Sequence, residues 1–218
     1  MPLDWNALLS QMNAMQRLAH FAARWGVIKE EQMRVQLLSV RRKAYETELG
    51  EQAVAVGCPG RVGRLVNDGI TSRLNDASDT DAKSISNTFN YFLAVEILRA
   101  GETNPRGGPL YYARAISAWA PTYWQWKYPQ ITQVAELTAR AMAQQDFYRI
   151  NGAALGSAKL EPQSAVCPVC LGWIARGAVP LRVALAAPPP YHPNCPHIFQ
   201  ITAKHVAKED CPLLWMGA

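Results

Sequence analysis

The chain has 218 residues, of which 49% are hydrophobic, and it contains seven tryptophans and eight tyrosines. This composition excludes an intrinsically disordered chain and is enough for one domain with a small appendage. The formal net charge is +5, which permits contact with nucleic acid without requiring it. No apolar run approaches the ~20 residues that cross a bilayer, and the N-terminus lacks the apolar block of a secretory signal. We therefore expect a protein assembled in the cytoplasm, with no membrane partner.

The first 79 residues are predicted to form a helical N-terminal extension. Apolar residues recur at spacings of three and four over residues 8–22 and again over residues 33–44, as they do along one face of a helix. Gly26 is expected to break the first helix, and Gly50 to end the second, because glycine is a poor helix former.

The densest basic cluster is Arg41, Arg42 and Lys43, near the expected end of the second helix. Cations at that end interact favourably with the helix dipole, which is a purely structural explanation. The same three side chains are also the candidates for binding nucleic acid, through phosphate contacts that carry no sequence preference. The sequence leaves both interpretations open.

Residues 80–156 are predicted to form a helical domain. Its expected elements are, in chain order, a helix, a connector, a short helix, an aromatic link and a long helix, at residues 80–100, 101–109, 110–119, 121–129 and 130–151. The connector is rich in glycine but lacks the lysine and hydroxyl of a phosphate-binding loop. The aromatic side chains of the link are expected to pack in a core rather than to stack on bases.

Residues 157–218 are predicted to form a C-terminal metal-binding module. Proline and glycine become frequent there, and short apolar runs at Val179–Leu185 and His197–Thr202 are typical of β-strands. The module contains CPVC at residues 167–170 and HPNCPH at residues 192–197. Clustered cysteines and histidines in a chain expected in the cytoplasm indicate a metal rather than disulfides.

Structural zinc sites take four thiolate or imidazole ligands in a tetrahedron. Cys167 and Cys170 are separated by two residues and can turn onto one ion, and His192 and Cys195 repeat the same separation. The predicted ligands of a Zn²⁺ ion are therefore Cys167, Cys170, His192 and Cys195. His197 is the alternate fourth ligand, because it follows Cys195 by two residues, and Cys211 is a weaker candidate.

The zinc is expected to be structural, and no catalytic residue is predicted. A catalytic zinc needs an open coordination position and a neighbouring general base. The nearest acids are Glu161, Glu209 and Asp210, and none adjoins a ligand in the sequence. A redox dithiol is the other interpretation of CPVC, since such a motif usually opens a helix after a strand. The helical sequence before CPVC and the Cys/His cluster after it argue against that interpretation.

The predicted fold class is mainly α, with a helical body followed by a small β-containing zinc knuckle. By a zinc knuckle we mean two turns held by one ion, with little core of their own, whose folding depends on the metal. Trp173, Leu181 and Phe199 are the expected apolar lining of this module.

The CPVC motif, followed after a spacer by PPPYHPNC, resembles the end of phage minor head proteins of the Mu F-like head morphogenesis family. The helical stretches ARAISAWA at 113–120 and LTARAMAQQDFYRINGAALG at 137–156 are also similar to that family. The resemblance covers about residues 80–203. Where the family usually has CRC, this chain has Cys195, Pro196 and His197, so the resemblance leaves the fourth ligand open.

The resemblance implies a non-enzymatic structural protein of the virion, assembled in the host cytoplasm. Its implied partners are the portal protein and the major capsid protein of a phage particle, in a symmetric assembly that holds several copies of the chain. Its implied role is in head assembly or in genome packaging and delivery, with non-specific DNA contact permitted. The alternatives are a non-specific nucleic-acid-binding zinc module and, least favoured, a zinc-dependent hydrolase.

Overall fold

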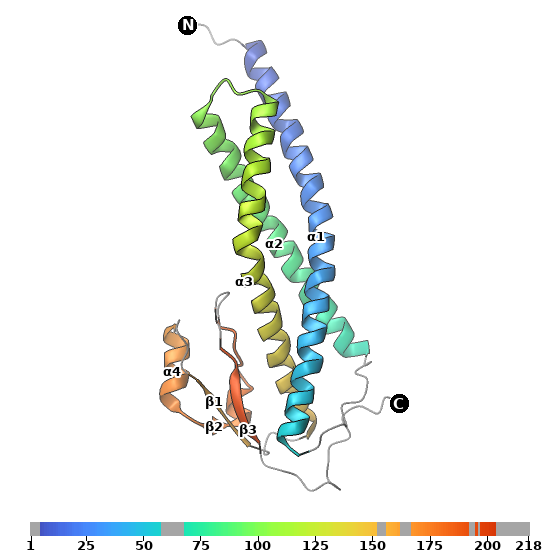
Figure 1. Cartoon of the computed structure of the whole chain (residues 1–218), viewed down its shortest axis with the longest axis vertical. Helices are drawn as coiled ribbons and strands as arrows, with labels where there is room; N and C mark the ends of the chain where they lie inside the picture. Colours follow the sequence, from blue (N-terminus) through green and yellow to red (C-terminus); the bar gives the residue numbers. More distant parts are fainter. Residues whose placement is uncertain are drawn as a thin grey trace. The chain divides into compact units, whose positions relative to one another are not determined.

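The computed structural model describes residues 5–57, 68–151, 156–161, 167–191, 195 and 197–203, with side chains from residue 29 onward except at 109, 150, 151 and 203. These residues form three long helices, α1 (Trp5–Ala55), α2 (Asp68–Thr103) and α3 (Pro109–Asn151), which Figure 1 shows together with a small sheet. The predicted fold class is confirmed, since the described chain is mainly helical with a small C-terminal sheet beside a Cys/His cluster.

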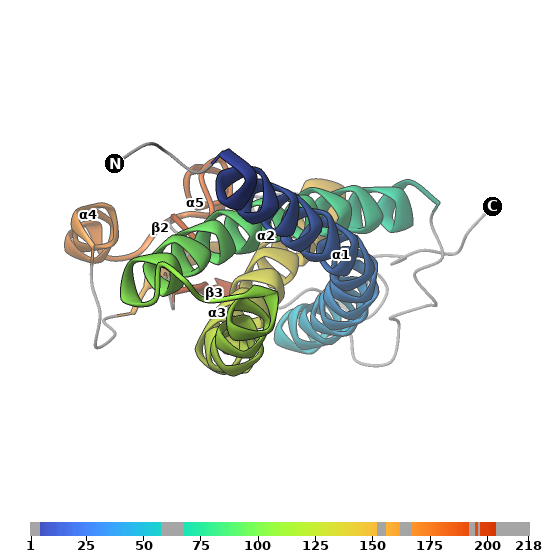
Figure 2. The ribbon, with the colours of Figure 1, turned by 90° about the horizontal axis from the view of Figure 1, so that it is seen from above.

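The sheet has three antiparallel strands in the order β2-β1-β3, namely β1 (Gly156–Leu160), β2 (Val179–Pro180) and β3 (Phe199–Ala203). Two short helices accompany it, α4 (Pro168–Arg176) and α5 (Leu181–Ala184), and both pack on β1. Figure 2 shows α4 and α5 as separate short helices that are connected through β2.

The long helices extend further than predicted. Helix α1 continues through Gly26 and Gly50, and α3 continues through Pro121 and Pro129, so that the aromatic link is helical. A glycine inside a helix costs about 1 kcal/mol and a proline about 3 kcal/mol relative to alanine. Packing outweighs these costs, because buried residues lie near the breakers, such as Leu49 beside Gly50.

The two strand predictions had different outcomes. The strand expected over His197–Thr202 is confirmed as β3. The strand expected over Val179–Leu185 is wrong beyond its first two residues, because β2 ends at Pro180 and α5 begins at Leu181. Pro180 has no N–H to continue a strand ladder, and proline suits the residues just before a helix.

The chain divides into two compact units, each made of separated segments. The first unit comprises Met1–Gln36 and Asp79–Tyr128, and the second comprises Leu37–Ser78 and Pro129–Ala218. The three domains predicted in chain order, 1–79, 80–156 and 157–218, do not coincide with these units. Each long helix contributes residues to both units, which a sequential division cannot represent.

The core of the first unit is aromatic. Phe89 of α2 is 1% exposed, and its ring centroid lies 5.4 Å from that of Trp119 and 5.1 Å from that of Trp124. Tyr123 is also buried in this cluster, as expected of residues in the aromatic link, whereas Trp126 is half exposed. Helix α2 therefore packs on α3 through this aromatic cluster.

Replacing Phe89 with alanine is expected to lower the free energy of unfolding by about 3–5 kcal/mol, because the lost ring leaves a cavity in this core. Urea denaturation followed by tryptophan fluorescence measures the effect. Phe92→Ala is the matched control, since the Phe92 side chain is 40% exposed and its loss creates less of a cavity. Equal losses for the two variants would contradict the assigned core.

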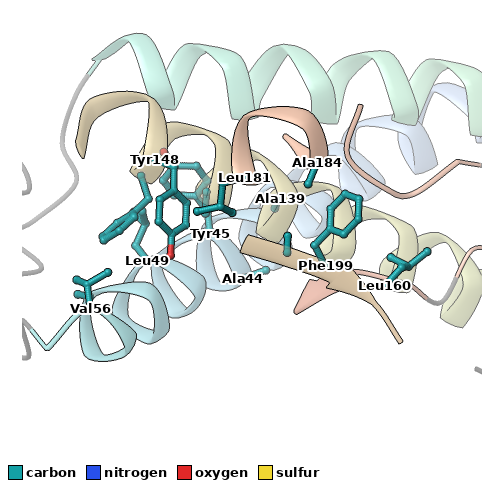
Figure 3. Packing of buried hydrophobic residues seen from close by; sticks show 14 of the residues in the cluster. Ala44, Tyr45, Leu49, Val56, Ala139, Tyr148, Leu160, Leu181, Ala184 and Phe199 are labelled. Carbon is teal, nitrogen blue, oxygen red and sulfur yellow. The ribbon is translucent and has the colours of Figure 1, made fainter. Parts of the chain in front are cut away.

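The core of the second unit is shared between the long helices and the C-terminal module. Figure 3 shows Tyr45 and Leu49 of α1, Tyr148 of α3, Leu181 of α5 and Phe199 of β3 among its members. Ile70 and Leu74 of α2 belong to the same cluster. The buried side chains of the module thus belong to a core that all three long helices share.

Among the described residues, none of the helices combines the length and the apolar character that a membrane span requires.

Candidate metal centre

The CPVC motif begins helix α4, and its sequence fixes the two cysteines one turn apart. Cys167 is the N-cap, and its Sγ accepts a hydrogen bond from the Cys170 backbone N–H at 3.4 Å. Pro168 occupies the first turn, where its missing N–H costs nothing and its φ suits a helix. Gly177 ends the helix with φ of 66°, a left-handed conformation that glycine adopts without strain. The N-cap geometry of Cys167 places its sulfur 3.3 Å from that of Cys170.

The second half of the site precedes β3. Cys195 Sγ lies 3.7 Å from Cys170 Sγ and 3.6 Å from His197 Nδ1. Leu160 of β1 pairs with Phe199 of β3, and α4 packs on β1, so the sheet holds the two halves together. Cys170, Cys195 and His197 are each at most 2% exposed.

Three buried ligand atoms therefore form a group that can hold a metal ion. The donor atoms of Cys170, Cys195 and His197 all lie within 4.8 Å of one another. Cys167, which is half-buried, adds a fourth donor through its short distance to Cys170. Four such donors are the number that a tetrahedral site requires.

The structure brings together three of the four predicted ligands, Cys167, Cys170 and Cys195. His192, the preferred fourth ligand, and Cys211, the weaker candidate, lie outside the described residues. His197, the alternate fourth ligand, is at the cluster. His192 precedes Cys195 by three positions and His197 follows it by two, so both histidines are near enough in sequence to serve as the fourth ligand.

The thiols lie in different electrostatic environments. The backbone N–H of Cys170 lowers the pKa of the Cys167 thiol. Burial raises the pKa of Cys170 to about 12, and the neighbouring sulfurs add to the increase. A bound metal ion would reverse this, because its positive charge stabilises buried thiolates. The donor set therefore fits a thiophilic cation.

One feature of the structure agrees with a redox dithiol at CPVC, and others argue against it. CPVC does open a helix that follows a strand, since α4 comes after β1. However, Cys195 and His197 share the cluster with the CPVC pair, and the sheet is antiparallel. A redox dithiol requires only its two cysteines, whereas a metal site also requires further ligands such as a third sulfur and an imidazole.

The expected apolar lining of the module is confirmed. Trp173, Leu181 and Phe199 are all buried, and the Trp173 and Phe199 rings meet edge to face with centroids 5.3 Å apart. The guanidinium of Arg176 lies over the Trp173 ring at 4.8 Å from its centroid. Cys170 and Cys195 belong to the same hydrophobic cluster as Trp173, Leu181 and Phe199.

Among the described residues, the group that can hold a metal contains no carboxylate. Glu161, the acid before the motif, pairs with Lys159 at 2.5 Å. Glu209 and Asp210, the acids after it, lie outside the described residues. The described donor group thus consists of sulfur and imidazole nitrogen.

The basic cluster on α1 is only partly on the surface. Arg41 is 2% exposed, so its guanidinium does not face solvent, and the predicted contact with nucleic acid is limited to the exposed Arg42 and Lys43. The explanation by the helix dipole fails too, because α1 continues to Ala55 and the dipole effect is confined to the last turn.

The sequence did not indicate the buried polar residues behind the sheet, above all Glu48 of α1 and Gln144 of α3. They belong to no motif. The available signal is that each lies among buried apolar positions of its helix, such as Tyr45 before Glu48 and Ala141 before Gln144.

Comparisons of the chain with protein-family models, with curated proteins and with solved structures gave no match. The resemblance to phage minor head proteins therefore stays a prediction that depends on the motif.

Proposed function

We propose that the chain is a structural protein whose C-terminal module is held by one zinc ion. The observation that carries this proposal is the buried group of Cys170, Cys195 and His197, with all donor atoms within 4.8 Å of one another. Sulfur and imidazole nitrogen are the donors that structural zinc prefers. Cys167 completes the set, and His192 is the candidate that would replace His197.

The biological role that we propose is that of a minor head protein of a phage particle, near the portal or the inner face of the capsid. The support is the resemblance of the CPVC and HPNC motifs and of the stretches at 113–120 and 137–156, which lie in or overlap α3. The role that we infer is non-enzymatic, as the resemblance implies.

Quantitative mass spectrometry of purified particles tests the role. We expect the chain in particles at a small fraction of the major capsid protein, and elemental analysis of the purified chain should give one zinc per molecule. A chain that is abundant in the lysate but missing from particles would refute the virion role. A chain without zinc would refute the metal site and leave the virion role to be judged separately.

The exposure of Arg42 and Lys43 favours non-specific DNA binding as a second candidate function. Binding to a long duplex should then strengthen as salt falls, and reversing both charges should reduce the salt slope by about 2, at roughly 0.9 per phosphate contact. Fluorescence anisotropy over a salt series measures both effects. No binding at low salt would remove this candidate.

A further inference from the structure

A buried side chain of helix α3 forms a hydrogen bond with the strand that follows the metal ligands. Gln144 is 2% exposed, and its Nε2 donates a hydrogen bond to the backbone oxygen of Phe199 at 3.2 Å. Phe199 begins β3 and follows His197 by two residues. The position of the His197 backbone therefore depends on a contact that α3 makes.

The same amide nitrogen reaches α1. Gln144 Nε2 also donates to Glu48 Oε1 at 2.7 Å, since a primary amide carries two hydrogens. Glu48 is 1% exposed and accepts further bonds from Gln52 Nε2 at 2.7 Å and from Arg140 Nε at 2.6 Å. Gln144 is thus the link between a carboxylate-centred network on α1 and α3 and the backbone beside a metal ligand.

The link is sensitive to the position of β3. Polar groups buried without a partner cost free energy, and water has little access to Gln144 or Phe199 at 2% exposure. Phe199 is also held by its ring contact with Trp173 of α4 and by its pairing with Leu160. A shift of β3 after loss of the metal would break the bond from Gln144 and leave the network incomplete.

We propose that Gln144 is a positioning residue for the metal centre, and that it couples metal occupancy to the packing of α1 on α3 within the second unit. This inference rests on the proposed metal site. Gln144 fixes Phe199, and through it His197, in the arrangement that binds the ion. By reciprocity, the bound ion strengthens the Glu48 network by the same factor, and couplings between sites typically amount to about 5- to 150-fold.

The test compares Gln144→Met with Gln145→Met in the full chain. Gln145 is the matched control, because its Nε2 donates to the backbone oxygen of Leu185 at 2.8 Å, ten positions before Cys195 in the chain, and not to β3. Chelator competition with Co²⁺ and with Zn²⁺ measures the metal affinity. We expect Gln144→Met to lose about 5-fold or more in affinity, within the range above, and Gln145→Met to bind as the wild type does.

Hydrogen exchange supplies a second readout that a general loss of stability does not produce. In the wild type, metal should slow the exchange of α1 amides around Glu48, and this difference should vanish in Gln144→Met. If Gln144→Met does not fold, Glu48→Gln carries the test, since it keeps the side-chain shape but weakens the acceptor.

The outcomes separate this coupling from the proposed metal site. Wild-type affinity and wild-type metal-dependent protection in Gln144→Met would overturn the coupling and leave the metal site standing. If Gln144→Met is unfolded, a wild-type metal affinity in Glu48→Gln would overturn the coupling and leave the metal site standing. A wild-type chain that binds neither Co²⁺ nor Zn²⁺ would overturn the metal site and the coupling together.

Discussion

Replacing Cys170 with serine is expected to abolish metal binding and to destabilise the whole second unit, including its helical part. The Cys170 side chain is fully buried and belongs to the cluster that contains Tyr45, Phe147 and Phe199. Serine offers zinc a poor ligand, and loss of a structural metal is among the changes that cost more than about 4 kcal/mol. Elemental analysis and urea denaturation give the two readouts.

Val169→Ser is the matched control for Cys170→Ser. Val169 precedes Cys170 in the same helix, but its side chain is 52% exposed, so its replacement should keep the zinc and change stability by about 0.5 kcal/mol or less. Limited proteolysis locates the damage in Cys170→Ser. Cleavage confined to residues after 160, with α1 and α3 fully protected, would contradict the shared core.

The metal cluster could be predicted because its chemistry is local. Two cysteines separated by two residues, with a proline between them, were predicted to turn both sulfurs onto one ion, and the structure forms this turn as the start of helix α4, which was not predicted from the sequence. The choice of the fourth ligand could not be predicted in this way. His192 lies three positions before Cys195 and repeats the CPVC spacing, whereas His197 lies two positions after it, and the approach of His197 depends on how the chain enters β3, which tertiary contacts decide.

The helix ends and the division into two units could not be predicted from sequence patterns either, because they too depend on contacts between distant segments. Gly50 and Pro121 are unfavourable in a helix taken alone, yet contacts with distant segments keep α1 and α3 continuous. Glu48 and Gln144 bond to each other across 96 positions of sequence, and no periodicity within α1 or α3 indicates their pairing. The mainly helical class was predictable because apolar spacing within each helix is a local property.

Replacing Glu48 with alanine is expected to lower the free energy of unfolding by about 3–5 kcal/mol, the usual cost of removing one partner from a buried ion pair. Three side chains lose an acceptor at once: the amides of Gln52 and Gln144 and the guanidinium of Arg140, of which Gln144 keeps Phe199 O and Arg140 keeps Glu51. Arg140 is 28% exposed and can recover part of its hydration, but Gln144 cannot. Urea denaturation of the metal-loaded chain measures the loss.

Glu51→Ala is the control that distinguishes the effect of burial from the effect of charge. Glu51 pairs with the same Arg140 but is 53% exposed. An exposed ion pair contributes about 1 kcal/mol or less, and salt screens it. The loss for Glu51→Ala should therefore be small and should shrink further in salt, whereas the loss for Glu48→Ala should change little. Equal and salt-sensitive losses for the two variants would show that Glu48 acts as a surface charge, and the network could then not transmit metal occupancy to α1.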